Sequence, residues 1–267
     1  MANHYTAHKD EWKALSDIDY FGMFVKAYIP FNAWMNVSYS TLDSDRAKIN
    51  EIKRSHNPFR DKICALLEAD SQEGVNFKGL IGELHDLLES HYIHNQDKRI
   101  TLTDITLGRN PTNISEDTYR GIGFRVQYGN GSANSTSVHT LIKRRNGNSI
   151  CSITQSDYNL DELKSHPNFV GVTDNNYRSK ILNCYGLVIP FLKKDLTSGF
   201  NHANEREYYI CGRYKLIREK ESIAIGLIEI IYNLRNSLFH GELIPDKDAN
   251  KVYGAAYQIM RILIDSI

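Results

Sequence analysis

The sequence predicts a mainly helical α+β protein, a helical bundle interrupted by a small antiparallel sheet. Apolar residues recur at helical spacing in the first 95 residues and again toward the C-terminus. Between these regions the helical period disappears and turn residues multiply. Hydrophobic residues make up 41% and charged residues 24% of the 267-residue chain, which is typical of globular proteins. We therefore expect N-terminal helices in 1–95, a β-rich insertion in 96–160 and a C-terminal helical part in 161–267.

The N-terminal part is expected to hold three helices. The first covers about 18–39, and Pro30 should kink or break it because proline removes one ladder hydrogen bond. The second begins at Asp43 or Asp45 with an acidic cap, and Asn57-Pro58 interrupts it. The third covers about 77–92.

The insertion reads as strands over 99–105 and 123–128, followed by a hairpin over 138–153. Asn146-Gly147 predicts a tight type I′ turn in that hairpin, since both central positions of this turn need positive φ. Helical character returns over 177–192, is strongest over 206–240, and closes with a helix over 248–267.

Charge and cysteine content restrict the classes of function. Lys plus Arg and Asp plus Glu both total 32, so a site for RNA must be a local basic patch. The four cysteines form no CxxC pair, which disfavours a zinc clip or a disulfide scaffold. The polar N-terminus and the absence of a long apolar run predict a cytoplasmic protein without a membrane partner.

The segment 223–241 carries the chemistry. One arc of its helix is apolar and forms core, with Ile223, Leu227, Ile230, Ile231, Leu234 and Leu238. The opposite face is a continuous polar stripe of Glu229, Asn233, Asn236 and His240, with Arg235 at the margin. Gly241 and Pro245 are helix-stop signals, so His240 should lie in the last turn or at the cap. A histidine that exchanges protons near neutral pH, beside a permanent guanidinium charge, suits phosphodiester chemistry.

The string Arg235-Asn236-Ser237-Leu238-Phe239-His240 resembles the R-x(4–6)-H motif of HEPN domains. It includes the asparagine often found after the arginine and the glycine often found after the histidine. The resemblance covers only 223–267, and the β insertion lies outside the family pattern. HEPN proteins are helical bundles. Many are metal-independent ribonucleases of toxin–antitoxin, abortive-infection and CRISPR-linked defence systems, and they commonly dimerise so that two motifs form one site.

The resemblance implies RNA as substrate, a homodimer, a neutralising or regulatory protein partner, and no cofactor. The RNA 2′-hydroxyl would attack the adjacent phosphorus and leave a 2′,3′-cyclic phosphate and a 5′-hydroxyl. His240 would serve as general base or acid, and Arg235 would neutralise charge on the phosphoryl oxygens. Asn236 would orient the imidazole or hold a phosphate oxygen.

Other interpretations remain open. The domain could be a catalytically silent module that binds RNA, a nucleotide or a protein, or a structural helical protein with a chance motif. Glu229 and Asn233 fit a solvated helix face or a face shared by a dimer around the active site. Lys143, Arg144 and Arg145 lie beside the expected hairpin turn, where they could contact an RNA backbone or simply be a soluble charged turn.

Overall fold

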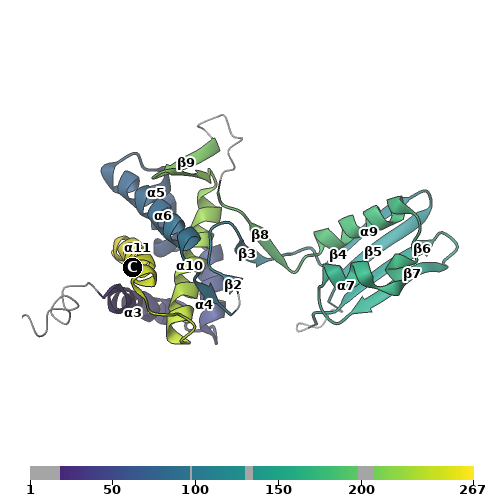
Figure 1. Ribbon diagram of the computed structural model, residues 1–267, viewed down its shortest axis with the longest axis horizontal. Coiled ribbons are helices and arrows are strands. Elements are labelled where there is room, and N and C mark those ends of the chain that lie inside the picture. Colours follow the sequence, from purple (N-terminus) through teal and green to yellow (C-terminus); the bar gives the residue numbers. More distant parts are fainter. Residues whose placement is uncertain (1–18, 97, 130–134, 198–206) are drawn as a thin grey trace, which may run out of the picture. The chain divides into compact units, whose positions relative to one another are not determined.

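The structure is a computed structural model that describes residues 19–96, 98–129, 135–197 and 207–267. It is an α+β protein of helices and small antiparallel sheets, as predicted (Figure 1). The chain divides into two compact units. We call Leu107–Lys193 the sheet unit and the chain up to Thr106 together with Lys194 onward the helical unit. The sheet unit differs in its limits from the insertion expected over 96–160, because three helices after residue 160 pack on its sheet.

The described part of the helical unit contains six helices. They are α3 (Tyr20–Ser38), α4 (Asp45–Arg54), α5 (Pro58–Glu68), α6 (Gln72–Ser90), α10 (Lys220–Phe239) and α11 (Lys247–Ile264). Helix α11 packs on α3, α5 and α6, while α10 packs on α4 and α5. Two hairpins complete the unit: β1 (His94–Asn95) with β2 (Lys98–Arg99), and β9 (Tyr208–Cys211) with β10 (Tyr214–Ile217).

The N-terminal helices agree with the expected ones except at their ends. Helix α3 runs through Pro30 as one helix, so the expected break is absent; it buries residues on both sides of the proline, including Phe24 and Phe31. Ser44 caps α4 by accepting from the Ala47 N–H at 3.2 Å, so the expected acidic cap was wrong. Helix α5 begins at Pro58, as expected, whereas α6 begins at Gln72 rather than at 77.

Two sequence assignments in this unit were wrong. The helix expected over 206–240 is helical only from Lys220, because 208–217 form the β9–β10 hairpin. Its turn contains Gly212 at φ +60, and Gly82 of α6 lies so close that a Cβ there would collide with the Cys211 carbonyl. The strand expected over 99–105 is absent as well, because that stretch is mostly irregular chain between β2 and β3 (Ile105–Arg109).

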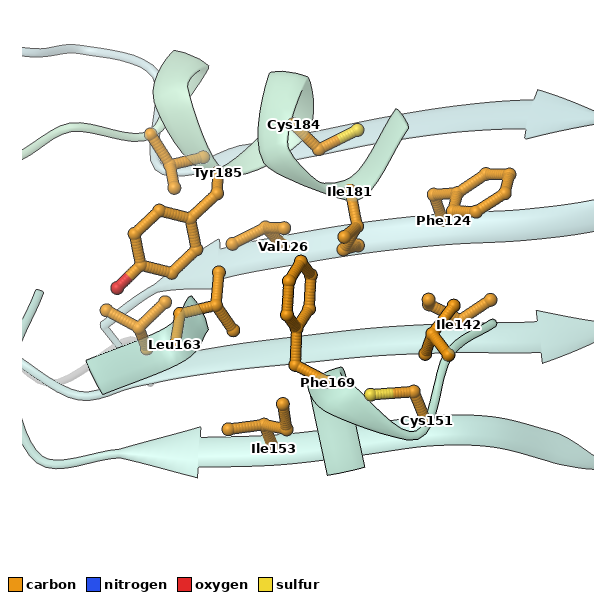
Figure 2. Packing of buried hydrophobic residues seen from close by; sticks show 13 residues of the cluster. Phe124, Val126, Ile142, Cys151, Ile153, Leu163, Phe169, Ile181, Cys184 and Tyr185 are labelled. Carbon is orange, nitrogen blue, oxygen red and sulfur yellow. The ribbon is translucent and has the colours of Figure 1, made fainter. Parts of the chain in front are cut away.

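The sheet unit has a four-stranded antiparallel meander covered on one face by helices (Figure 1). Its elements are β4 (Ile114–Tyr119), β5 (Ile122–Tyr128), β6 (Val138–Arg144), β7 (Ser149–Gln155), α7 (Leu160–Ser165), α8 (Pro167–Val170) and α9 (Asn175–Leu187). Figure 2 shows Ile181, Cys184 and Tyr185 of α9 facing the strands in the core of this unit. Alternate residues of β5, β6 and β7 enter this core, which is the period-2 pattern of a sheet with one covered face.

Two hairpin turns lie at one end of this sheet, and the type I′ turn is not the one that the sequence predicted. Arg120 and Gly121 join β4 to β5 with φ of 49° and 77°, the two positive values of a type I′ turn. The β6–β7 turn has positive φ only at Gly147, and Gly147 N–H donates to the Arg144 carbonyl at 2.9 Å. The type I′ turn predicted at Asn146-Gly147 was therefore wrong, because the connection is a three-residue loop with its glycine in the left-handed region.

The chain enters and leaves the sheet unit through two strands that pair with each other, β3 and β8 (Phe191–Lys194). Further backbone hydrogen bonds flank the pair, from Asn110 N–H to the Pro190 carbonyl at 2.9 Å and from Leu196 N–H to the Leu102 carbonyl at 3.0 Å. Among the described residues, no helix has both the length and the apolar character needed to cross a membrane.

Candidate functional site

Most residues of helix α10 are buried, and its polar stripe is not a fully solvated face. The apolar arc is buried as expected except for Leu238, which is half-buried, and Glu229 and Asn236 keep only 7% and 8% of their surface exposed. The expectation of a continuous exposed stripe was wrong because α4 packs against this side of α10. His240 is the C-cap, with Gly241 beyond it at φ +68, so the predicted helix end is confirmed.

Glu229 is a structural tie between α4 and α10. Arg46 donates to both of its carboxylate oxygens at 2.8 and 2.9 Å, and Lys53 donates to one at 2.8 Å. Burial acts to raise the pKa of Glu229, but the charges of Lys53 and Arg46 outweigh it and hold the pKa below its usual value. Arg46 also lies over the Tyr232 ring at 4.4 Å. Glu229 is therefore covered within one chain and cannot serve as an exposed dimer face.

Asn233 extends this network toward the β1–β2 hairpin. Its amide group donates to Glu229 at 3.4 Å, and its oxygen accepts from the Asn95 amide at 3.0 Å. The side chain is half-buried. Asn233 thus connects α10 to β1, and its described partners all lie within one chain.

Arg235 is held by neighbours on three elements. Its Nη1 donates to the Asn236 oxygen at 2.9 Å, and its Nη2 lies 3.7 Å from a carboxylate oxygen of Asp45 at the start of α4. The guanidinium carbon is 4.7 Å from the Phe239 ring centroid and 5.9 Å from that of Tyr28. With 23% of its side chain exposed, Arg235 is a pre-oriented cation rather than a free one.

Sequence reasoning missed Tyr28, Asp45 and Phe239 as neighbours of Arg235. Burial raises the pKa of the Tyr28 phenol far above its usual value, so the group stays neutral, and its hydroxyl has no hydrogen-bond partner among the described residues. The buried Nε of Arg235 also has no hydrogen-bond partner among the described residues. Phe239 lies within the motif and one helical turn from Arg235, and this spacing could have predicted the contact between them. No sequence signal marked Tyr28 or Asp45, because contacts between distant helices leave no periodicity.

His240 is exposed at the end of α10, and within the described ranges no hydrogen bond or ion pair engages its ring. It lies between Phe239, which is 55% exposed, and the loop that carries Ile244, which is 79% exposed. Asn236 accepts from Arg235, and no hydrogen bond joins its side chain to the His240 ring among the described residues. The expected orientation of the imidazole by Asn236 is therefore not seen: Asn236 positions Arg235 instead.

No hydrogen bond joins the side chains of Arg235 and His240 among the described residues. The two residues are five positions apart, which is about 140° of rotation on an ideal helix. The end of α10 thus offers a fixed cation on one side and a free imidazole on another.

The other predicted basic residues lie in the sheet unit. Arg144 and Arg145 line one open depression, whereas Lys143 does not. Over the residues that the structure describes, no three His, Cys, Asp or Glu side chains gather as a metal site. No family model, no curated protein and no solved structure matches this chain.

Proposed function

We propose that this chain is a HEPN-type endoribonuclease that cleaves RNA without a metal ion. The observation that supports the proposal best is that one motif at a helix end contains both a pre-oriented arginine and an unengaged histidine. Helix α10 is largely buried and therefore provides a rigid support for the side chains of such a site.

In the proposed reaction the 2′-oxygen of the RNA forms a bond to the adjacent phosphorus while the bond from phosphorus to the 5′-oxygen breaks. A histidine takes the proton from the 2′-hydroxyl, and a second proton must reach the leaving 5′-oxygen. Arg235 stabilises the charge on the non-bridging oxygens. Asn236 and Asp45 fix the plane of its guanidinium, so little reorganisation is needed when that charge develops.

Two copies of the chain would complete the site. Among the described residues no hydrogen bond joins Arg235 to His240, and one histidine cannot be acid and base in the same step. In a symmetric dimer the same surface of each chain meets its copy, so two His240 side chains can serve the two proton transfers. The exposed Phe239 and Ile244 beside His240 add apolar surface for such a contact.

A specific observation also favours a catalytically silent HEPN module. Arg235 pairs with Asp45 and lies near two aromatic rings, and these contacts alone would give it the structural role of holding α10 to α4. In that case the motif would be retained for packing, and binding of RNA or of a partner would lie elsewhere.

The deciding experiment compares the wild type with His240→Ala, each incubated with total RNA and a defined tRNA in excess EDTA. We expect cleavage by the wild type alone, with 2′,3′-cyclic phosphate ends, and a loss in the variant of about 10²-fold or more. Because His240 is exposed, the variant should keep the thermal unfolding temperature of the wild type. Equal cleavage by both proteins would contradict the proposal, and silence from both would favour the binding module.

A further inference from the structure

The two hairpin turns of the sheet unit lie side by side at one end of its sheet. Ile122 of β5 pairs with Tyr119 of β4 on one side and with Arg144 of β6 on the other. Neighbouring antiparallel strands are about 5 Å apart, so the Arg120–Gly121 turn stands next to the loop 145–147. We call this region the two-turn end.

An open depression of about 740 Å³ lies at the two-turn end. Its lining includes three arginines, Arg120, Arg144 and Arg145, together with apolar surface from Ile122 and Tyr177. Arg144 continues the alternation of Thr140 and Ile142, which face the helix-covered side of the sheet, while Lys143 faces the opposite side. Residues from two turns and from the first turn of α9 therefore build one surface.

The charge of this surface is uncompensated. Among the described residues no acidic side chain pairs with Arg120, Arg144 or Arg145. Asp117, on the neighbouring strand β4, is already paired with Lys180 at 2.9 Å. The chain as a whole carries no formal net charge, so three unpaired guanidiniums at one end of a sheet form a local positive patch.

Arg120 adds an independent observation. It has a φ of 49°, a left-handed conformation that arginine rarely adopts and that asparagine or glycine would adopt more readily. Its guanidinium carbon lies 5.1 Å from the Tyr119 ring centroid, which directs the long side chain. A charged side chain at a position of backbone strain supports a functional role for that charge.

We propose that the depression at the two-turn end binds the phosphate backbone of an RNA strand. A guanidinium fork suits phosphate oxygens, and the apolar floor suits the ribose and base edges that accompany each phosphate. The depression is open, whereas sites for small molecules enclose most of their ligand, so a strand that crosses it fits better than a mononucleotide. The assignment of this strand as substrate rests on the proposed nuclease function, but the binding does not.

The test uses the full chain carrying His240→Ala, so that RNA stays intact, and fluorescence anisotropy of a short labelled single-stranded RNA. The pocket variant adds Arg144→Gln and Arg145→Gln. The matched control adds Arg109→Gln and Lys164→Gln, which remove two exposed charges of the same unit outside the depression. Arg120→Asn tests the second turn with a residue that accepts its backbone conformation.

We expect the pocket variant to bind RNA about tenfold more weakly or worse, and the control to lose less than about threefold. The slope of log K against log salt should become shallower by about 1.4 in the pocket variant, since each single-strand phosphate contact contributes about 0.7. Arg120→Asn should weaken binding severalfold. Thermal unfolding of all variants should be unchanged because each altered side chain is exposed.

Four results would overturn the inference. They are an undetectable affinity of the parent for RNA, equal affinities of pocket variant and control, an unchanged affinity of Arg120→Asn, and displacement of RNA by ATP at equal phosphate concentration. The wild-type nuclease assay separates this from the proposed function. If the pocket variant loses RNA binding and the wild type cleaves no RNA, the proposed nuclease function is contradicted but this inference is not. If the wild type cleaves RNA and the pocket variant keeps full affinity, this inference is contradicted but the nuclease function is not.

Discussion

The end of α10 and the two-turn end of the sheet unit both present arginines, but in opposite states. Arg235 has a hydrogen-bonded amide, a carboxylate at 3.7 Å and two aromatic rings around it. The arginines of the two-turn end are exposed and lack an acidic partner in the described chain. A side chain that is already ordered loses little entropy on meeting its ligand, which suits positioning at a reacting group. Free and uncompensated charge suits capture of a polyanion, because it acts at long range.

The largest expected effect tests how rigidly the α10 end is held. Lys53→Met removes the more buried of the two cations on Glu229 and leaves this carboxylate with Arg46, whose side chain is 44% exposed. We expect the free energy of unfolding to fall by about 3–5 kcal/mol. Urea unfolding would measure it. Arg46→Gln is the control and should cost less, about 1 kcal/mol, because solvent already screens that exposed cation.

The ion pair between Lys53 and Glu229 also makes the free energy of unfolding depend on pH. Because the folded pKa of Glu229 lies below its usual value, its contribution is complete above the unfolded pKa and is lost as pH falls through the folded pKa. In Lys53→Met the folded pKa of Glu229 should rise, so the acid-induced loss should begin at a higher pH than in the wild type. An identical acid profile for both proteins would contradict the proposed tie between α4 and α10.

The next effect is Arg235→Lys, which keeps the positive charge beside Asp45 but removes the planar fork. If Arg235 meets the phosphate, cleavage should fall about 10²-fold, with the unfolding temperature little changed. If Arg235 only holds α10 to α4, lysine should replace it and cleavage should persist. Rates on tRNA and thermal unfolding, measured on the same preparation, separate the two roles.

The smallest effect sharpens the description of the two-turn end. Lys143 and Arg144 are neighbours on β6 but face opposite sides of the sheet. Lys143→Gln should therefore weaken RNA binding less than Arg144→Gln, by about twofold against about fivefold. Equal losses would mean that RNA is attracted by the charge of the whole hairpin rather than by the depression.

Local features of the chemical segment were predictable from the sequence. The apolar arc of α10 follows from spacing alone, and Gly241 at positive φ explains why the helix ends at His240. The burial of Glu229 could not be predicted, because Arg46 and Lys53 are 183 and 176 residues away in the chain. A carboxylate on the polar side of a helix reads as solvated until its buried partners are known.

The wrong assignments have a common physical origin. The residues 208–217 are rich in aromatic and aliphatic side chains around Gly212, as a hairpin is, but their direct continuity with the strong α10 pattern favoured helix. The type I′ turn was assigned to Asn146-Gly147 because Asn-Gly is the commoner type I′ pair, whereas the loop length was fixed by the β6–β7 register. The depression at the two-turn end was out of reach because Arg120 and Arg145 become neighbours only through strand pairing.

The paired strands β3 and β8 make the sheet unit an insertion whose two ends lie next to each other. Because the chain departs and returns through two hydrogen-bonded strands, the ends of the 107–193 segment are adjacent. A short turn could replace the whole segment without moving the strands that hold it. Insertions at such a point are the ones that a fold tolerates best. In evolutionary terms, the helical unit could keep its motif while exchanging the module that it carries.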